Sequence, residues 1–397
     1  MGKMPWSNWT KPFWFVVLCA LFLQFGLGMQ RTIFSNFVSE ELGVRADQLG
    51  WLESVREIPG LLTFLMVGLT VFLARNILVA LSVGLVAAGL GLYAGANDMV
   101  SLVLATTVYS VGFHLFFPLQ SAQVLNLAGT GQKARRLGEL NSAAALAYLL
   151  AMGFVYLTAN WLNYRQLFLV GAVVVMGGVF TMLVLPRTVG AERPRSFVCR
   201  RRYWLYYALT FLGSSRRQIV TTFAVFALVQ VYGTPVRTIA AIMFLSNVVA
   251  VLTRSMCGGW VDRLGEGRML TISHIAVITI FLGYAFVRVP LILYALYIID
   301  NFFHGFDVAQ ATYLDKIALK GDVPPSLALG STINHITGVT VPVLSGYLWT
   351  SFGHSATFAF GAAVAAVSLL FVSRLPGTLR ALAPQVETAV AAGGDND

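Results

Sequence analysis

Long apolar stretches follow one another along almost the whole chain, and this feature constrains the fold most strongly. A stretch of about 18 or more mostly apolar residues can cross roughly 30 Å of hydrocarbon as a helix. The 397 residues are 57% hydrophobic and 11% charged, with a mean hydropathy of +0.75. So few charges cannot cover a water-soluble fold. Segments such as residues 77–94 lack the polar and apolar alternation of a β-barrel strand. We therefore expect an all-α membrane protein, because helices satisfy their own backbone groups in lipid.

Twelve transmembrane helices are expected. They cover residues 13–36, 48–73, 77–95, 100–126, 138–159, 166–186, 203–230, 237–257, 269–287, 290–313, 328–349 and 356–374. The first span has no small-residue cleavage site and is interpreted as a retained helix. A polar segment with Pro, Gly and many arginines follows the sixth span. We therefore expect an N-terminal six-helix bundle at 1–186, a cytoplasmic linker at 187–202, a C-terminal bundle at 203–376 and a disordered tail at 377–397.

The distribution of basic residues predicts the topology. An even number of spans places both termini on one side, and the loops of that side carry Lys133, Arg135, Arg136, Arg187, Arg193, Arg195, Arg200, Arg201, Arg202, Arg263, Arg268, Lys316 and Lys320. The opposite loops carry Arg45, Arg165, Arg237 and Arg288. The positive-inside rule then puts both termini in the cytoplasm of a multi-pass protein of the cell's inner or plasma membrane. The net charge of +10 is explained by these loops, so no nucleic-acid partner is expected.

The two halves resemble each other at corresponding helices. Residues 31–37 (RTIFSNF) and 217–223 (RQIVTTF) share Arg, Ile, a hydroxyl residue and Phe at the same offsets. In the fourth span of each half a histidine precedes a glutamine by the same interval, as His114 and Gln120 and as His304 and Gln310. Two such matches favour an internal duplication, the usual construction of secondary transporters.

A short motif follows the eighth span: Gly258, then Asp262, Arg263, Gly265 and Arg268. This motif resembles the loop signature of the major facilitator superfamily, and with the twelve spans and the repeat it identifies the chain as similar to that family. We expect Gly258 to permit close helix approach, Asp262 to cap or pair near the next helix, and the whole motif to act in gating. The resemblance implies two pseudo-symmetric six-helix bundles and alternating access, which a monomer can perform.

The sequence departs from the family pattern in two places. The loop after the second span, residues 68–75, lacks the aspartate of the signature, so that Arg75 is its only charged residue. The fifth span lacks the Gly-Pro pattern that resembles proton-coupled drug exporters. A drug or metabolite exporter is weakened by this departure but not excluded.

Charges inside the spans are the main functional signal, because a charged side chain in the bilayer is costly and usually faces the protein interior or a wet cavity. Glu53, Arg56 and Glu57 share one face of the second span, ahead of Pro59 and Gly60. Two interpretations stay open for these three side chains. They form an internal charge clamp that shapes the pathway, or they contact the solute or a proton directly.

Arginines at matching positions of the first and seventh spans suggest an anionic solute. Arg31 and Arg217 are repeat partners, and a guanidinium suits bidentate capture of a carboxylate or phosphate. Adjacent helix positions differ by about 100°. We therefore expect Arg217 to face the cavity and Arg216 to pair with an acidic residue of a neighbouring helix. The alternative for Arg31 is an outer position from which it snorkels to the interface.

The tenth span carries Asp300, His304 and Asp307, at offsets that place them on one helical face. This spacing favours a proton relay, since histidine titrates near neutral pH. The alternative is a transition-metal site formed by these three residues with His335, which His114 would help to complete. Further candidate solute contacts are Arg56, His114, Gln120, Gln310, Asn334 and His335, and the proton-coupling candidates are Asp300, His304, Asp307, Glu53 and Glu57.

The sequence therefore predicts a secondary active transporter of a small polar, anionic solute, coupled to protons. A transition-metal permease and a drug or metabolite exporter are the alternatives. We expect no cofactor and no enzymatic activity, because no loop is long and no nucleophile motif is present. A fixed channel suits the repeated halves less well than rocking does.

Overall fold

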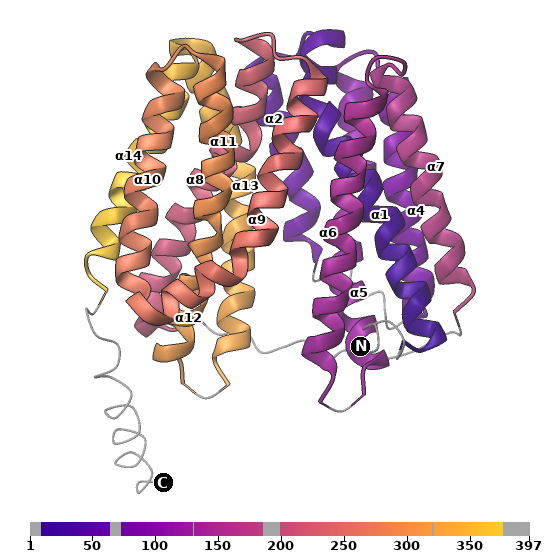
Figure 1. The fold of residues 1–397 in the computed structure, drawn as a ribbon, viewed down its shortest axis with the longest axis horizontal. Helices are drawn as coiled ribbons and strands as arrows, with labels where there is room; N and C mark the ends of the chain where they lie inside the picture. The colour runs from indigo at the N-terminus through magenta and orange to yellow at the C-terminus, as the bar shows by residue number, and fades with distance from the viewer. Residues whose placement is uncertain (1–8, 64–72, 130, 186–198, 320, 376–397) are drawn as a thin grey trace, which may run out of the picture. The chain divides into compact units, whose positions relative to one another are not determined.

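Within the described residues every regular element is a helix (Figure 1). The computed structural model describes residues 9–63, 73–129, 131–185, 199–319 and 321–375. The helices are α1 Lys11–Asn36, α2 Ala46–Leu61, α4 Arg75–Gly95, α5 Met99–Leu127, α6 Lys133–Thr158, α7 Tyr164–Leu183, α8 Trp204–Gln230, α9 Val236–Leu264, α10 Glu266–Phe286, α11 Pro290–His304, α12 Val308–Ile317, α13 Val323–Phe352 and α14 His354–Val372. Short turns of other helix types lie at η2 Phe37–Glu41, η4 Arg201–Tyr203 and η5 Gly305–Asp307.

These helices confirm the all-α architecture of the spans predicted from the sequence. Ten helical segments in the described residues are long and apolar enough to cross a membrane. The second and seventh spans are not among them. α2 ends at Leu61, just before residues that are not described, and α8 carries two adjacent arginines. The predicted tail and most of the predicted linker lie outside the described residues.

Contacts divide the chain into two compact units. Unit 1 comprises Met1–Arg193 with Val225–Asn247, and unit 2 comprises Pro194–Ala224 with Val248–Asp397. The end of α8 and the start of α9 therefore pack with the helices of the first half. The side-chain amide of Asn36 donates to the carbonyl of Thr234 at 3.1 Å within unit 1. The predicted domain boundary at 187–202 stays a prediction.

Unit 1 is built on close packing between α4 and its neighbours α5 and α7, and Figure 1 shows α1, α4 and α7 side by side. Glycines permit the closest approach. A Cβ atom at Gly89 of α4 would lie 2.6 Å from the Cα of Tyr109 on α5. A Cβ at Gly112 of α5 would lie 2.8 Å from the backbone nitrogen of Val86. Small residues are used in this way between membrane helices, where backbone contact replaces the hydrophobic driving force.

Unit 2 departs from the predicted spans in two places that matter for the site. The tenth span is not one continuous helix, because α11 ends at His304 and a 3₁₀ turn precedes α12. The eighth span continues beyond residue 257 to Leu264, so most of the predicted loop motif is helical. Only Gly265, with φ of +86°, separates α9 from α10. A left-handed φ of this kind favours glycine.

Ion pairs and hydrogen bonds fix one end of unit 2. Lys316 at the end of α12 lies 2.5 Å from the buried Glu266 at the start of α10. Asp322, which precedes α13, accepts a hydrogen bond from the hydroxyl of Tyr203 and pairs with Arg200 at 2.7 Å. The Tyr203 hydrogen bond and the Arg200 charge hold the pKa of Asp322 below its usual range.

We expect Gly89→Ala to destabilise the protein by about 1–3 kcal/mol, because the added methyl group meets the backbone of α5 and cannot be accommodated without a helix shift. Thermal unfolding of the purified protein in detergent measures the effect. Gly91→Ala on the same helix is the matched control, since a Cβ there meets nothing within 4 Å. Equal unfolding midpoints for the two variants would contradict the close α4–α5 packing.

Candidate functional site

One carboxylate of unit 2, that of Asp307, is shared by three neighbours. The guanidinium of Arg216 donates to its Oδ1 at 3.0 Å, and that of Arg217 donates to its Oδ2 at 2.6 Å. The Nδ1 atom of His304 lies 3.1 Å from the same Oδ2. Arg216 is buried, whereas the side chain of Arg217 is 46% exposed. Two adjacent arginines that leave α8 in different directions are thus held by one acidic residue.

The 3₁₀ turn between α11 and α12 places Asp307 in this position. A Cβ atom at Gly305, the first residue of the turn, would lie 2.9 Å from the sulfur of the buried Cys257 on α9. The ring of Phe306, the next residue, stacks on Trp260 with centroids 6.0 Å apart. Both contacts fix the turn against α9. Gly305 is therefore required by space rather than by backbone conformation.

A cavity of about 230 Å³ lies beside this ion pair, wholly within unit 2. It is formed by α8, by the α11–α12 turn region and by the first half of α13. Its lining residues are Tyr206, Thr210, Gly213, Ser214, Arg217, Asp307, Gln310, Ala311, Leu327, Gly330, Ser331 and Asn334. Four candidates from the sequence, Arg217, Asp307, Gln310 and Asn334, therefore line one cavity.

Two further charged residues of unit 2 belong to the same electrostatic group. Asp300 lies on α11 one turn before His304, and its charge interacts with those of Arg216 and Asp307. Its Oδ1 atom is buried and has no hydrogen-bond partner in the described part of the chain. Arg254 on α9 interacts electrostatically with His304. The residues that the sequence placed on one helical face, Asp300, His304 and Asp307, thus interact electrostatically with arginines of α8 and α9.

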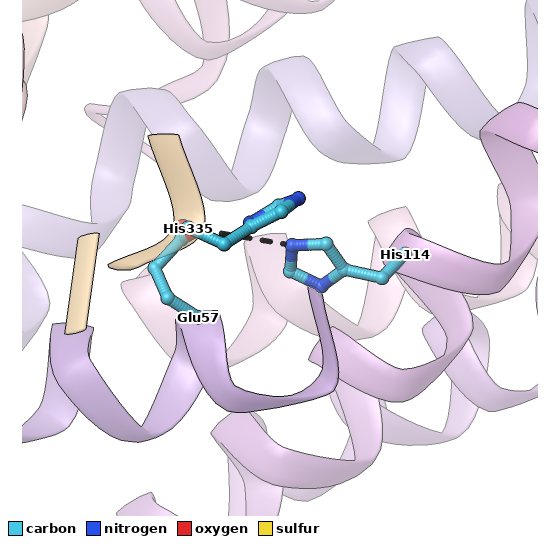
Figure 2. A group of neighbouring side chains, drawn as sticks. All are labelled: Glu57, His114 and His335. Carbon is cyan, nitrogen blue, oxygen red and sulfur yellow. Dashed lines mark ion pairs between the residues drawn. The ribbon is translucent and has the colours of Figure 1, made fainter. Parts of the chain in front are cut away.

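A second charged cluster lies in unit 1. Arg56 of α2 lies 2.7 Å from Glu53 and 3.4 Å from Glu57, so two carboxylates share one guanidinium within the helix. His114 of α5 points toward this cluster, with its Nε2 atom 3.9 Å from Glu57 (Figure 2). Ser110 hydrogen-bonds the backbone carbonyl of Arg56 and the other ring nitrogen of His114. The predicted ion pairs of the second span are present and extend to α5.

The remaining candidates of the first half lie in α1 and α5. Arg31 is half-buried, and its charge acts on Tyr109 of α5 and Tyr148 of α6. Gln120 is buried, and its side-chain nitrogen has no hydrogen-bond partner among the described residues.

The predicted roles within the loop motif are partly wrong. A Cβ atom at Gly258 would meet nothing within 4 Å, so this glycine is not needed for close helix approach. Asp262 does not cap the next helix, because the cap position is Gly265 and no side chain bonds there. Asp262, Arg263 and Arg268 are exposed. The buried Glu266 makes the ion pair that was expected of Asp262. The gating role of Asp262 stays a prediction.

The alternative metal site is not formed in the described part of the chain. The ligand atoms of Asp300, His304, Asp307 and His335 do not come together as a coordination set there. The 3₁₀ turn directs Asp307 toward two arginines, and guanidinium groups beside a carboxylate disfavour a cation at that carboxylate. His335 is on α13, a different helix from the other three.

Sequence reasoning missed several lining residues. Tyr206, Thr210 and Ser214 precede Arg217 on one face of α8 at helical spacing, and this spacing is a signal that the sequence offered. Arg254 lies within an apolar span and could have been found by the same charge criterion as the others. The contact between Gly305 and Cys257 left no sequence signal, since it joins distant segments.

Comparisons with known proteins agree with this architecture. The sequence model of the Major Facilitator Superfamily matches residues 16–323. Solved structures with a similar fold include nucleoside transporter NupG, with 15% identity, a TM-score of 0.77, and coverage of 92% of this chain and 98% of that one. No curated protein matches the sequence at a significant level.

Two other similar structures are also transporters. Peptide transporter POT, solved in complex with sulfate, has 12% identity, a TM-score of 0.76 and coverage of 97% of both chains. A bacterial homolog of the human lysosomal transporter Spinster has 12% identity, a TM-score of 0.66, and coverage of 94% of this chain and 96% of that one. At these identities the likeness shows the fold.

We expect Asp307→Asn to destabilise the protein by about 3 kcal/mol, because the substitution leaves the buried guanidinium of Arg216 without its counter-charge. Thermal unfolding in detergent measures the change. Asp315→Asn is the matched control, since Asp315 is exposed on the neighbouring α12. An unfolding midpoint for Asp307→Asn as high as that of the control would show that Arg216 does not depend on Asp307.

Proposed function

The chain belongs to the Major Facilitator Superfamily, a family of secondary transporters, and we propose that it carries a small polar, anionic solute by alternating access, coupled to protons. Its fold and its apolar helices make it an integral multi-pass membrane protein. The arrangement of Arg217 carries the proposal for the solute. This guanidinium is half exposed on the cavity of unit 2 and uses only one side-chain nitrogen on Asp307.

The charge balance beside the cavity supports an anion. Arg216 and Arg217 share a single carboxylate, so the lining keeps an unbalanced positive charge next to Asp307. Arg254 adds a third positive charge to the group, and the negative charge of Asp300 offsets it. A planar guanidinium with free donors binds a carboxylate or phosphate in bidentate fashion. A solute anion thereby supplies the charge that the protein lacks at this position.

The size and polarity of the cavity support a small polar solute. Its volume of about 230 Å³ is below the range of roughly 300–1,000 Å³ typical of sites for drug-sized ligands. Hydroxyl and amide side chains form much of its wall. Both properties disfavour the drug exporter that the sequence left open.

Competition for Arg217 supplies a physical route to proton coupling. An anion that binds Arg217 removes one of the partners of Asp307 and brings a second negative charge close to it. Protonation of His304, or of the nearby Asp300, relieves that repulsion while Arg216 keeps its counter-charge. His304 contacts the same oxygen at 3.1 Å, and Asp300 lies one turn away with an unpaired buried oxygen. We assign these three residues to proton transfer in unit 2.

The charged cluster of unit 1 is also assigned to proton coupling. Glu53 and Glu57 are buried and share Arg56, which gives that cluster the opposite excess charge to that of the cavity. We propose that these carboxylates take part in coupling. We assign solute contacts to Arg31, Arg56, His114, Gln120 and His335 together with the cavity residues. Asp262, Arg263, Gly265 and Arg268 are proposed to act in gating.

The distribution of basic loops supports a proposal for the cellular setting. The excess of Lys and Arg on one side favours cytoplasmic termini in an inner or plasma membrane. The similar solved structures are named as transporters of nucleosides and peptides, which are polar solutes, and one was solved with the anion sulfate. A monomer suffices, because the cavity forms within one chain.

We expect Arg217→Gln to lower the uptake of organic anions by at least tenfold, because glutamine is similar in shape but cannot neutralise the anion. Counterflow into proteoliposomes loaded with a panel of organic anions and phosphates identifies the transported class and measures the loss. Arg374→Gln, which changes an exposed arginine just after α14, is the matched control. Arg263 is not used for this purpose, because it is assigned to gating. Unchanged uptake by Arg217→Gln would rule out the anion site.

We expect Asp300→Asn to uncouple transport from protons, because an amide is similar in size to a protonated carboxyl group and cannot release a proton. An imposed pH gradient should alter the transport rate of the native protein, and the variant should lose most of this response while it keeps exchange of solute. Transport into proteoliposomes with and without the gradient measures both quantities. Asp315→Asn is the control. A full response to the gradient in Asp300→Asn would remove this residue from the proton path.

A further inference from the structure

We infer that the cavity of unit 2 selects an anion that also carries hydroxyl groups, of the sugar-acid class, and that Asn334 and Gln310 recognise those hydroxyls. The inference rests on the proposed function and narrows its substrate class. It comes from the order of the lining groups along α8. The charged residues Arg217 and Asp307 form one level of the cavity, and the neutral amides of Asn334 and Gln310 form the next level.

The contacts between α8, α12 and α13 define three levels in the cavity. Arg217 meets Asp307 at the first level. One turn earlier on α8, Ser214 hydrogen-bonds Asn334, and Gly213 faces Gln310. Earlier again, the hydroxyl of Tyr206 lies against Gly330. Four residues of helix span about 6 Å. The amides therefore lie about one helical turn from the arginine.

The hydrogen bond of Ser214 orients the amide of Asn334. The serine hydroxyl donates to Oδ1 of the asparagine, so the NH₂ group is left to donate into the cavity. Gln310 faces Gly213, where a Cβ atom would lie 3.2 Å from its Nε2 and 3.9 Å from its Oε1. An amide supplies two donors and one acceptor with two lone pairs. Together the two amides can pair with hydroxyl groups, which both donate and accept.

The glycine on α8 makes room for this amide level. A Cβ atom at position 213 would lie 3.2 Å from Nε2 of Gln310, so the glutamine amide would have to shift away from α8. At the next level a Cβ atom at Gly330 would lie 2.6 Å from the hydroxyl oxygen of Tyr206. The two glycines thus keep polar groups, rather than alkyl groups, at the surface of the cavity.

Other anions fit this order of groups less well. A simple alkyl carboxylate would satisfy Arg217 but would leave the amides facing methylene groups, and sites built to pair a hydroxyl reject analogues that lack it. A dicarboxylate would place its second charge among neutral amides and hydroxyls. No cation lines that level among the described residues. An unpaired carboxylate in such surroundings is costly.

Three six-carbon anions test the assignment directly. Gluconate carries one carboxylate and several hydroxyls, hexanoate lacks the hydroxyls, and adipate carries a second carboxylate instead. Proteoliposomes loaded with gluconate should take up labelled gluconate, and unlabelled gluconate outside should inhibit this uptake at least tenfold more strongly than hexanoate or adipate does. Equal inhibition by hexanoate, or stronger inhibition by adipate, would overturn the inference.

Variants of the amide level identify the recognising residues. We expect Asn334→Leu and Gln310→Leu each to reduce the preference for gluconate over hexanoate about tenfold, because each removes a hydrogen bond to a hydroxyl in a desolvated site. Thr332→Val is the matched control on α13, since the Thr332 hydroxyl bonds the backbone of its own helix and does not line the cavity. A preference left unchanged by both leucine variants would overturn the assignment of these amides.

The same assay separates this inference from the proposed function. Loss of gluconate counterflow in Arg217→Gln, combined with an unchanged preference in Asn334→Leu and Gln310→Leu, would keep the anion site and reject the hydroxyl level. Full gluconate counterflow in Arg217→Gln would reject the anion site itself. Size-exclusion chromatography of each variant in detergent shows whether it is folded before it is assayed.

Discussion

The cost of holding the buried Arg216 inside a membrane helix governs much of unit 2. A guanidinium in an apolar bundle needs a counter-charge, and Asp307 supplies it at 3.0 Å. To reach α8 the carboxylate must leave the tenth span at a turn, and the 3₁₀ segment provides that turn. This turn requires a glycine at position 305, because the sulfur of Cys257 occupies the space that a Cβ atom would need. Ion pair, helix break and helix packing thus form one dependent set.

This arrangement leaves Arg217 free to serve a solute. Arg216 takes one oxygen of Asp307 in the protein interior, and Arg217 takes the other at the edge of the cavity. An anion that displaces Asp307 from Arg217 leaves Arg216 still paired, so the structural contact survives while the binding contact changes. Adjacent arginines on a helix therefore divide the work, one holding the fold and the other presenting a charge. In the proposed function, proton uptake at His304 or Asp300 then balances the arriving anion.

The spans, the charged residues and the family were predictable from the sequence because each leaves a local or compositional signal. Apolar runs mark helices, and a charge within such a run stands out on its own. Helical spacing also grouped Asp300, His304 and Asp307, and it predicted that Arg216 pairs with an acidic residue of another helix. The cavity was harder to predict, because Tyr206, Gly330 and Asn334 meet only through the packing of separate helices. The error at Gly258 has the same origin, since a glycine in a motif does not reveal what lies beside it.

The corresponding positions of the two halves explain why the cavity charge lies in unit 2. His304 precedes Asp307 by three residues, and at the same offset from His114 the first half has Phe117. Phe117 packs edge-on against Phe113 and Phe116 and offers no counter-charge. The charge of Arg31, the counterpart of Arg217, acts on Tyr109 and Tyr148. The first half instead carries its carboxylates on α2, where Glu53 and Glu57 enclose Arg56.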